Sequence, residues 1–358
     1  MAFGMIALPV MIWAEPILLM VGQGDALAAI AGQYLAVAGW GIVPALLVMV
    51  LKSYLAALER TQVVLWITLV AAVINALANY AFIFGNWGAP ELGVVGAAIA
   101  SVTTQIVSLI GVVIYVLWVM PQHSLFVRMW RADVQMLSKV FRLGWPISIT
   151  ALSEVGLFAA SAMMMGWLGT IALAAHGIAM QLASITFMVH LGISNVATIR
   201  AGNAYGRQDR SHMARGAIIA MAMSLGFAAL TVIVFVGWPE PLISIFMQRD
   251  EPARDDILAV GFGLLAMAAL FQLMDGAQAI ALGLLRGVQD TQVPMVLAGV
   301  SYWGIGIPCS YVLGFTLGFE GIGVWAGLVI GLGVAAILLN LRFWRGTINT
   351  VGDAETDK

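Results

Sequence analysis

The chain has 358 residues, of which 62% are hydrophobic and 9% are charged, and its mean hydropathy is +0.99. A soluble domain has about 45 to 50% apolar and about 25% charged residues, so this composition excludes a soluble globular protein and predicts an integral membrane protein. The net charge of −2 provides no basic field for nucleic acid, and the single cysteine, Cys309, excludes an internal disulfide and a cysteine-based metal site.

Ten apolar runs are long enough to cross the hydrocarbon core as helices, which takes about 20 residues. They span residues 2–21, 34–51, 63–84, 92–120, 140–168, 171–199, 213–238, 257–285, 293–319 and 321–341. Strands that span a membrane would read as segments of about ten alternating residues, and long unbroken runs satisfy their backbone groups in lipid only as helices. The sequence therefore predicts an all-α protein with about ten transmembrane helices.

The basic residues are distributed unevenly among the loops that join these runs. Apart from Arg249 and Arg254, the lysines and arginines fall on alternate loops, on the side where both ends of the chain lie. The positive-inside rule then predicts that both termini are cytoplasmic. Termini on the same side require an even number of spans, which agrees with ten.

Three short segments recur in the same order along the chain. WAEP from Trp13 recurs as WPEP from Trp238, RTQVV from Arg60 as DTQVP from Asp290, and ELGVVGAA from Glu91 as FEGIGVWAG near Glu320. Internal repeats of this kind are typical of secondary transporters, whose substrate and ion sites lie near the membrane midplane.

The repeat also predicts how the chain is organised. We expect a remnant of an N-terminal lobe with four helices (1–120), a cytoplasmic interlobe linker (121–139), a C-terminal lobe with six helices (140–345) and a cytoplasmic tail (346–358). The linker is either an interfacial amphipathic segment or a solvated loop, and the tail is expected to be disordered. The second copy has two further spans ahead of it, so we expect that about 80 to 90 residues with two more helices precede Met1 in the full-length protein, and that this chain is an N-terminally truncated product or has a misplaced start codon.

Two carboxylic acids, Glu154 and Asp275, lie in the middle of apolar runs, whereas the other acids lie at or near run ends or in loops. A charge at the bilayer centre costs about 2.5 to 3.5 kcal/mol, so such residues usually line a cavity and bind or carry something. Thr150, Phe158 and Ser161 share a helical face with Glu154 and suit a cavity wall. The alternative is a protonated glutamic acid that hydrogen-bonds to a neighbouring helix.

Asp275 lies between Gln272 and Gln278 at intervals of three residues. A carboxylate between two amides can accept a proton or coordinate a cation through oxygen ligands. Asn75 and Asn79 stand four residues apart on one face of an earlier span, where amides serve either as hydrogen bonds between helices or as ligands. These residues are candidates for supporting the acids or for lining a substrate cavity.

The sequence contains no motif of a nucleotide-binding loop, a zinc protease, a serine hydrolase or a redox pair of cysteines. It therefore predicts no enzyme, no cofactor and no metal site other than a Na⁺ site at Glu154 and Asp275. An intramembrane enzyme that uses the two acids as an acid–base pair is the weaker alternative, because neither a nucleophile nor a metal cluster accompanies them.

Three stretches of the chain together resemble the multidrug and toxic compound extrusion (MATE) family, particularly its NorM-type bacterial members. Residues 143–209 contain LGWP ahead of Glu154, then LAAH, and close on RAGNAYGRQD from Arg200 to Asp209. FQLMDGAQAIALGLLRGVQDTQVP at 271–294 and INALANYAFIFG at 74–85 add two further matches. The resemblance covers essentially the whole chain.

This resemblance implies a fold of twelve helices in two lobes of six, and efflux of organic cations coupled to inward movement of Na⁺ or H⁺. In such proteins the positions that match Glu154 and Asp275 are implicated in cation coupling. The first two helices of the family, with an acid of the N-terminal lobe, are absent from this sequence.

The expected function is therefore multidrug efflux by an antiporter of the bacterial inner membrane. We expect it to act as a monomer on small amphipathic, mostly cationic drugs or dyes. Two alternatives remain open. One is a flippase of the same fold that moves a lipid-linked intermediate, and the other is a fragment that does not transport.

Overall fold

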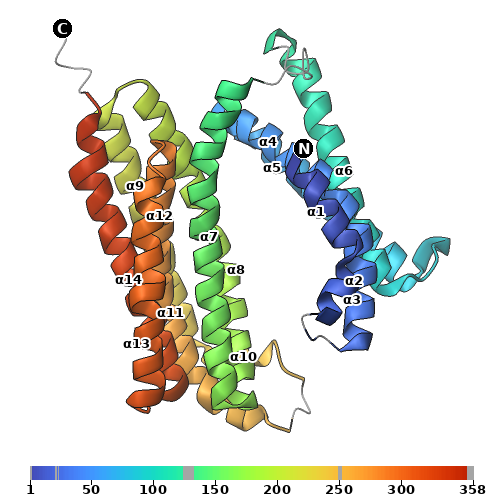
Figure 1. Cartoon of the computed structure of the whole chain (residues 1–358), viewed down its shortest axis with the longest axis vertical. Coiled ribbons are helices and arrows are strands. Elements are labelled where there is room, and N and C mark those ends of the chain that lie inside the picture. The colour runs from blue at the N-terminus through green and yellow to red at the C-terminus, as the bar shows by residue number, and fades with distance from the viewer. Residues whose placement is uncertain (1, 21, 23, 124–132, 249–251, 353–358) are drawn as a thin grey trace. The chain divides into compact units, whose positions relative to one another are not determined.

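The computed structural model describes residues 2–20, 22, 24–123, 133–248 and 252–352, which are drawn in colour in Figure 1. These residues form helices and turns with no β-strand among them. The chain divides into two compact units, Met1–Arg131 and Ala132–Lys358. The boundary between the units falls inside the segment 121–139 that the sequence marks as a linker.

The first unit consists of helices and short 3₁₀ turns. Its helices are α1 (Ala2–Ile12), α2 (Ala14–Met20), α3 (Asp25–Ala38), α4 (Ile42–Ala57), α5 (Thr61–Phe84) and α6 (Gly93–Val119), with single turns at Gly39–Gly41, Asn86–Gly88 and Pro121–His123. Helix α5 ends at Phe84 because Gly85 takes the left-handed conformation, with φ of 68°. Leu51 and Leu55 of α4 pack with Val112 and Val116 of α6 to form the core of this unit.

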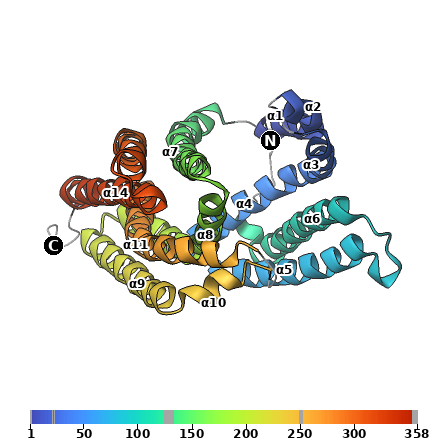
Figure 2. The ribbon, with the colours of Figure 1, turned by 90° about the horizontal axis from the view of Figure 1, so that it is seen from below.

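The second unit contains eight α-helices and three shorter π-helical segments. They are α7 (Val134–Leu168), α8 (Thr170–Gly206), α9 (Arg210–Gly237), α10 (Pro239–Ser244), α11 (Arg254–Gly287), α12 (Gln292–Gly299), the π-helix η4 (Val300–Gly306), α13 (Ile307–Tyr311), the π-helix η5 (Val312–Thr316), α14 (Glu320–Leu341), the π-helix η6 (Arg342–Gly346) and a 3₁₀ turn at Thr347–Thr350. Helix α11 packs against α8, α9 and α14 (Figures 1 and 2).

The core of the second unit is centred on α11 and α14. Trp325 of α14 is fully buried, its indole Nε1 donates a hydrogen bond of 3.1 Å to Nδ1 of His176, and its ring meets Phe271 edge-on at 5.6 Å between centroids. Indole N–H groups need a partner when they are buried, and His176 supplies it from α8. This contact fixes α14 and α8 on either side of α11.

Nine helices of the described residues are long and apolar enough to cross a membrane, and the chain is a multi-pass membrane protein. Each of these helices matches one of the ten predicted runs. The prediction was wrong for the first run, 2–21, which is divided at Trp13 into α1 and α2. Pro16 explains the break, because a proline ring clashes with the carbonyl four residues earlier, here that of Ile12.

The structure shows how the predicted linker ends, and it corrects the start of the predicted tail. Helix α7 already begins at Val134, because the carboxylate of Asp133 accepts hydrogen bonds from the N–H groups of Gln135 and Met136, each at 3.0 Å. Disorder was wrongly predicted for the start of the tail, since Thr347–Thr350 forms a turn and Ile348 and Val351 are buried against the core. Residues 124–132 and 353–358, where the rest of these predictions fall, lie outside the described residues.

The motif from Arg200 to Asp209 builds the turn between α8 and α9. The carboxylate of Asp209 caps α9 by accepting the N–H of His212 at 2.8 Å and the hydroxyl of Ser211 at 3.1 Å. The N–H of His212 holds the pKa of Asp209 below its ordinary value. Nη2 of Arg200 lies 3.1 Å from Nε2 of the same histidine. The residues of this motif therefore have a structural role, because they form the turn between α8 and α9.

Helix α14 packs closely through a stripe of glycines. A Cβ at Gly323 would overlap the backbone of Leu313, and one at Gly327 would overlap the backbone nitrogen of Ser310. A Cβ at Gly331 would lie 2.8 Å from Cα of Gly306. Side chains cannot be accommodated there, because the neighbouring atoms belong to the backbone of η4, α13 and η5. Small residues at every fourth position are a device for close helix packing in membranes.

Replacement of Gly327 by alanine should destabilise the second unit, whereas the same change at Gly333 should not. The methyl group at position 327 meets a backbone that cannot move aside, which typically costs about 1 to 3 kcal/mol. A methyl group at position 333 would lie 3.4 Å from Sδ of Met274, within reach of a flexible side chain. Thermal unfolding of the two purified variants in detergent measures the difference. Equal melting temperatures would contradict this account of the α14 interface.

Candidate functional site

The structure brings the two membrane acids of the second unit together. Glu154 lies on α7 and Asp275 on α11, and Nε2 of Gln278, one turn after Asp275, donates a hydrogen bond of 3.4 Å to Oε1 of Glu154. Asp275 is only 2% exposed and is close enough to Glu154 for the two to interact electrostatically. The residues Glu154, Asp275 and Gln278 are therefore one cluster, formed where α7 meets α11.

Several buried oxygen atoms around this cluster have no hydrogen-bond partner among the described residues. They are Oδ1 of Asp275, Oε1 of Gln272, Oε1 of Gln278 and the hydroxyl of Tyr302. The large majority of buried side-chain polar atoms in proteins are paired, and leaving one unpaired costs about 1 to 3 kcal/mol. A concentration of unpaired oxygens beside a carboxylate fits the oxygen ligand set of a small cation, or a carboxylate that exchanges a proton.

Arg286 and Tyr302 belong to the same electrostatic environment, and sequence reasoning missed both. Arg286 interacts with Glu154 and Tyr302, and Tyr302 interacts with Glu154 and Asp275 as well. Arg286 follows Asp275 by eleven residues, or about three helical turns, and this spacing places it on the same face of α11. The regular spacing is visible in the sequence, although Arg286 is also one of the basic residues on alternate loops that indicate membrane orientation.

A π-helix positions Tyr302 beside the acids. Within η4, Tyr302 is fully buried while the neighbouring Trp303 is 50% exposed. Nε1 of Trp303 donates a hydrogen bond of 3.2 Å to the carbonyl of Ser153, the residue before Glu154. A Cβ at Gly156 would lie 2.7 Å from the same indole ring. Gly156 therefore allows η4 to approach α7 next to Glu154.

On the other side of α11, a glycine admits two polar side chains next to Asp275. A Cβ at Gly276 would lie 2.8 Å from the ring of His190 and from the hydroxyl of Ser224. Nδ1 of His190 lies 2.7 Å from Oγ of Ser224, which joins α8 to α9. The absence of a side chain at Gly276 therefore lets side chains of α8 and α9 approach α11 closely at this point.

Gln272 has two roles in the structure. Its Nε2 donates hydrogen bonds to the carbonyl of Ala183, at 2.7 Å, and to the hydroxyl of Thr186, both on α8. These bonds fasten α11 to α8 one turn before Asp275. The amide oxygen of Gln272 stays unpaired, so the side chain combines a structural donor with a free acceptor.

The other residues predicted on the face of Glu154 contribute to packing. The hydroxyl of Thr150 donates to the carbonyl of Pro146 at 2.9 Å and that of Ser161 to the carbonyl of Phe158 at 2.8 Å, both within α7. Phe158 packs against Phe271 of α11, with ring centroids 5.9 Å apart. Neither hydroxyl donates to Glu154, so Phe158 is the member of this group that links α7 to α11.

Asn75 and Asn79 lie in the first unit, where they connect helices. Nδ2 of Asn75 donates a hydrogen bond of 2.9 Å to Oγ1 of Thr104 on α6, and Nδ2 of Asn79 donates to Oδ1 of Asn75 at 3.0 Å. Asn75 also lines a polar cavity of about 380 Å³, together with Lys52 and Ser101. The structure thus shows the hydrogen bond between helices that was one of the two predicted roles, and places Asn75 at a cavity wall as well.

The described residues contain no group of three or more His, Cys, Asp or Glu side chains that could hold a metal ion. A cation at this site would therefore rely on the two carboxylates, the amide oxygens and Tyr302. Such a mixed set suits a weakly bound ion that is exchanged, since tightly held structural metals need more charged ligands.

Comparison with known proteins identifies the family. The family model described as MatE matches residues 1–81 and 146–312. The probable multidrug resistance protein NorM of Rhizobium meliloti (strain 1021) is 46% identical over 348 residues, which are 96% of this chain and 74% of that protein. Its counterpart in Agrobacterium fabrum is 45% identical over 344 residues, with the same coverage of both chains. The multidrug resistance protein NorM of Burkholderia vietnamiensis is 34% identical over 92% of this chain and 71% of that protein.

Two solved structures illustrate the fold that this chain shares. A crystal structure of MATE in the straight conformation superposes with a TM-score of 0.86 at 18% identity and covers 98% of this chain and 76% of that chain. The eukaryotic MATE transporter AtDTX14 gives a TM-score of 0.81 at 18% identity, over 97% of this chain and 78% of that chain. The fold is therefore that of the MATE transporters, which confirms the resemblance seen in the sequence. With a family model that matches more than half of its length and a relative 46% identical over 96% of it, the chain belongs to the MatE family.

Proposed function

We propose that the chain is a multidrug efflux antiporter in which Glu154 and Asp275 bind the coupling ion, Na⁺ or H⁺. The observation that carries this proposal is the cluster of the half-buried Glu154 and the buried Asp275, with unpaired oxygens beside them, where α7 meets α11. The names of the relatives, multidrug resistance proteins, support drug efflux as the activity. Small amphipathic cations are the expected substrates, because they carry the charge that the two acids attract.

Antiport follows from the cost of leaving these acids uncompensated in the membrane. A coupling ion or a cationic substrate can each neutralise the cluster, and both cannot do so at once, so binding of one favours release of the other. One charge that moves down 100 mV releases about 2.3 kcal/mol, enough for roughly fifty-fold accumulation of a substrate. A single ion per cycle would therefore suffice to drive efflux, and no cofactor is required.

Arg286 is close enough to Glu154 to influence it but does not neutralise it permanently. The two residues interact electrostatically, yet they form no ion pair within 4.0 Å in the described part of the chain. A direct ion pair would remove the negative charge that a transported cation needs. The present arrangement leaves Glu154 available for an exchangeable ion.

The proposed setting is a bacterial inner membrane, with both termini in the cytoplasm and the chain acting as a monomer. The distribution of lysines and arginines on alternate loops supports this orientation. Under this orientation, the start of α7 and the end of α14 lie on the cytoplasmic side.

Replacement of Glu154 by glutamine and of Asp275 by asparagine should each abolish ion-driven efflux. The amides keep the size of the side chains but lose the charge that binds the ion, so we expect the initial rate to fall at least about tenfold. Efflux of a fluorescent cationic dye from proteoliposomes, driven by an imposed Na⁺ or pH gradient, measures this rate. Glu240→Gln is the matched control, because Glu240 is exposed on α10 outside the cluster. Efflux at the wild-type rate in both site variants would refute the assignment.

Replacement of Tyr302 by phenylalanine should weaken ion binding without destabilising the protein. The hydroxyl is buried and unpaired, so its removal ought to leave the melting temperature unchanged or raise it slightly. The loss of one oxygen ligand is expected to raise the ion concentration for half-maximal efflux by about threefold to tenfold. Thermal unfolding and ion-dependent dye efflux of the same preparation separate the two effects. A lower melting temperature with unchanged ion dependence would mean that Tyr302 serves packing alone.

A further inference from the structure

A cavity of about 850 Å³ lies at one end of the second unit. It is formed by the start of α7, the turn between α11 and α12, and Arg342 just after α14. In Figure 1, α7 begins and α14 ends at the same, upper end of this unit. Helix α11 ends at Gly287, about three turns or 18 Å beyond Asp275. The cavity is therefore separate from the cluster of membrane acids.

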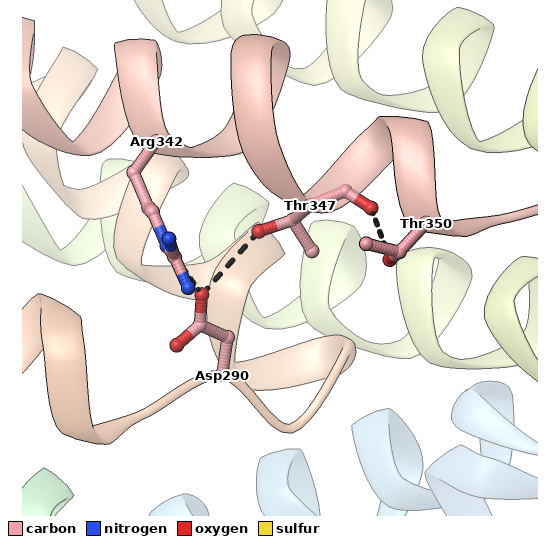
Figure 3. Close-up of polar contacts among 4 residues, drawn as sticks. All are labelled: Asp290, Arg342, Thr347 and Thr350. Carbon is pink, nitrogen blue, oxygen red and sulfur yellow. Dashed lines mark hydrogen bonds and ion pairs between the residues drawn. The ribbon is translucent and has the colours of Figure 1, made fainter.

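Positive charge dominates the walls of this cavity. Lys139, Arg142 and Arg342 line it, and Asp290 is the one acid among the described residues of its wall. Nε of Arg342 donates to Oδ2 of Asp290 at 2.9 Å, and the hydroxyl of Thr347 donates to the same oxygen at 3.3 Å, as Figure 3 shows. Arg342 thus neutralises Asp290 within the wall.

The remaining two cations are available to a ligand. In the described part of the chain, neither Lys139 nor Arg142 forms an ion pair or a hydrogen bond through its side chain. The side chains of Gln289, Thr291 and Gln292 add hydrogen-bond donors along the turn. Two uncompensated charges with several neutral donors form a site for an anion with several oxygen atoms, such as a phosphate group.

The position of the cavity along α7 places it at the level of the lipid headgroups. Helix α7 has 35 residues and is therefore about 52 Å long, whereas the hydrocarbon core is about 30 Å thick. Glu154 is the sole charged residue from Leu143 to the end of the helix, so that part lies in the membrane. Lys139 and Arg142 precede it by one turn and consequently fall in the interfacial region.

The cavity also has an apolar wall. Met136 and Val140 of α7 and Val293 of α12 line it, and Met136 and Val140 are 58% and 65% exposed. A free phosphate ion would gain nothing from these side chains, but the upper part of an acyl chain would bury them. Charged and apolar walls side by side match a molecule that has an anionic head and an apolar tail.

We propose that this cavity binds the phosphate group of an anionic phospholipid. Lys139 and Arg142 contact the phosphate, the turn at 289–292 donates hydrogen bonds to the headgroup, and the apolar wall accommodates the acyl chains. Basic pockets between transmembrane helices bind anionic headgroups in this way. The site does not depend on the proposed transport activity.

Native mass spectrometry of the purified chain tests the proposal with defined lipids. Phosphatidylglycerol is added in detergent, phosphatidylcholine with the same acyl chains is the zwitterionic probe, and inorganic phosphate is the soluble one. The variant is Lys139→Gln together with Arg142→Gln, which leaves the ion pair of Arg342 and Asp290 intact. Arg345→Gln is the matched control, because Arg345 belongs to the same η6 segment as Arg342 but does not line the cavity.

Phosphatidylglycerol should bind to the wild type and to the Arg345→Gln variant with equal affinity, and about thirtyfold more weakly to the double variant, since each basic residue near a headgroup contributes a factor of about five. Phosphatidylcholine should show no such difference. Equal binding of phosphatidylglycerol to the double variant and the wild type would overturn the site. Binding of inorganic phosphate without preference for phosphatidylglycerol would overturn the assignment to a lipid.

Discussion

The structure depends on the cost of keeping two carboxylic acids inside a membrane. Asp275 is almost completely buried and leaves an oxygen unpaired, and Glu154 is held beside it by one long hydrogen bond from Gln278. Nothing within ion-pair distance neutralises either acid among the described residues. Such an arrangement is costly when it is empty and favourable when a cation or a proton occupies it. In the proposed antiport, a transporter of the MatE family uses this difference because the coupling ion and the substrate compete for the same two acids.

Small residues allow the surrounding helices to form that cluster. Gly156 admits the indole of Trp303 beside Glu154, and Gly276 admits His190 and Ser224 beside Asp275. The stripe of glycines on α14 brings the irregular segment that carries Tyr302 close to the core. In lipid, helices associate through close packing and hydrogen bonds, because burial of apolar surface provides little driving force. The glycines therefore set the positions of the polar groups. A side chain at any of these glycines would displace a residue of the cluster around Glu154 and Asp275.

Much of the fold and the centre of the site could be predicted from the sequence. The long apolar runs identified the nine membrane helices found among the described residues, and a charge inside such a run identified Glu154 and Asp275 as candidates. Hydrophobicity alone gave the wrong structure in two places. Pro16 divides the first apolar run into two helices, and Ile348 and Val351 are buried although the tail around them is polar. Tyr302 could not be found, because a π-helix shifts the register on which helical spacing arguments rely. Arg286 could have been found, since its spacing from Asp275 is regular.

The central claim is that a transported cation and the coupling ion compete for Glu154 and Asp275. The direct measurement is the release of ions when a cationic dye such as ethidium binds to the purified protein, followed as protons in weakly buffered solution and as ²²Na⁺ from preloaded protein. The account predicts that the wild type releases one of these ions in proportion to the bound dye, and that a variant with both Glu154→Gln and Asp275→Asn releases neither. Saturable dye binding to the wild type with no release of either ion would contradict it.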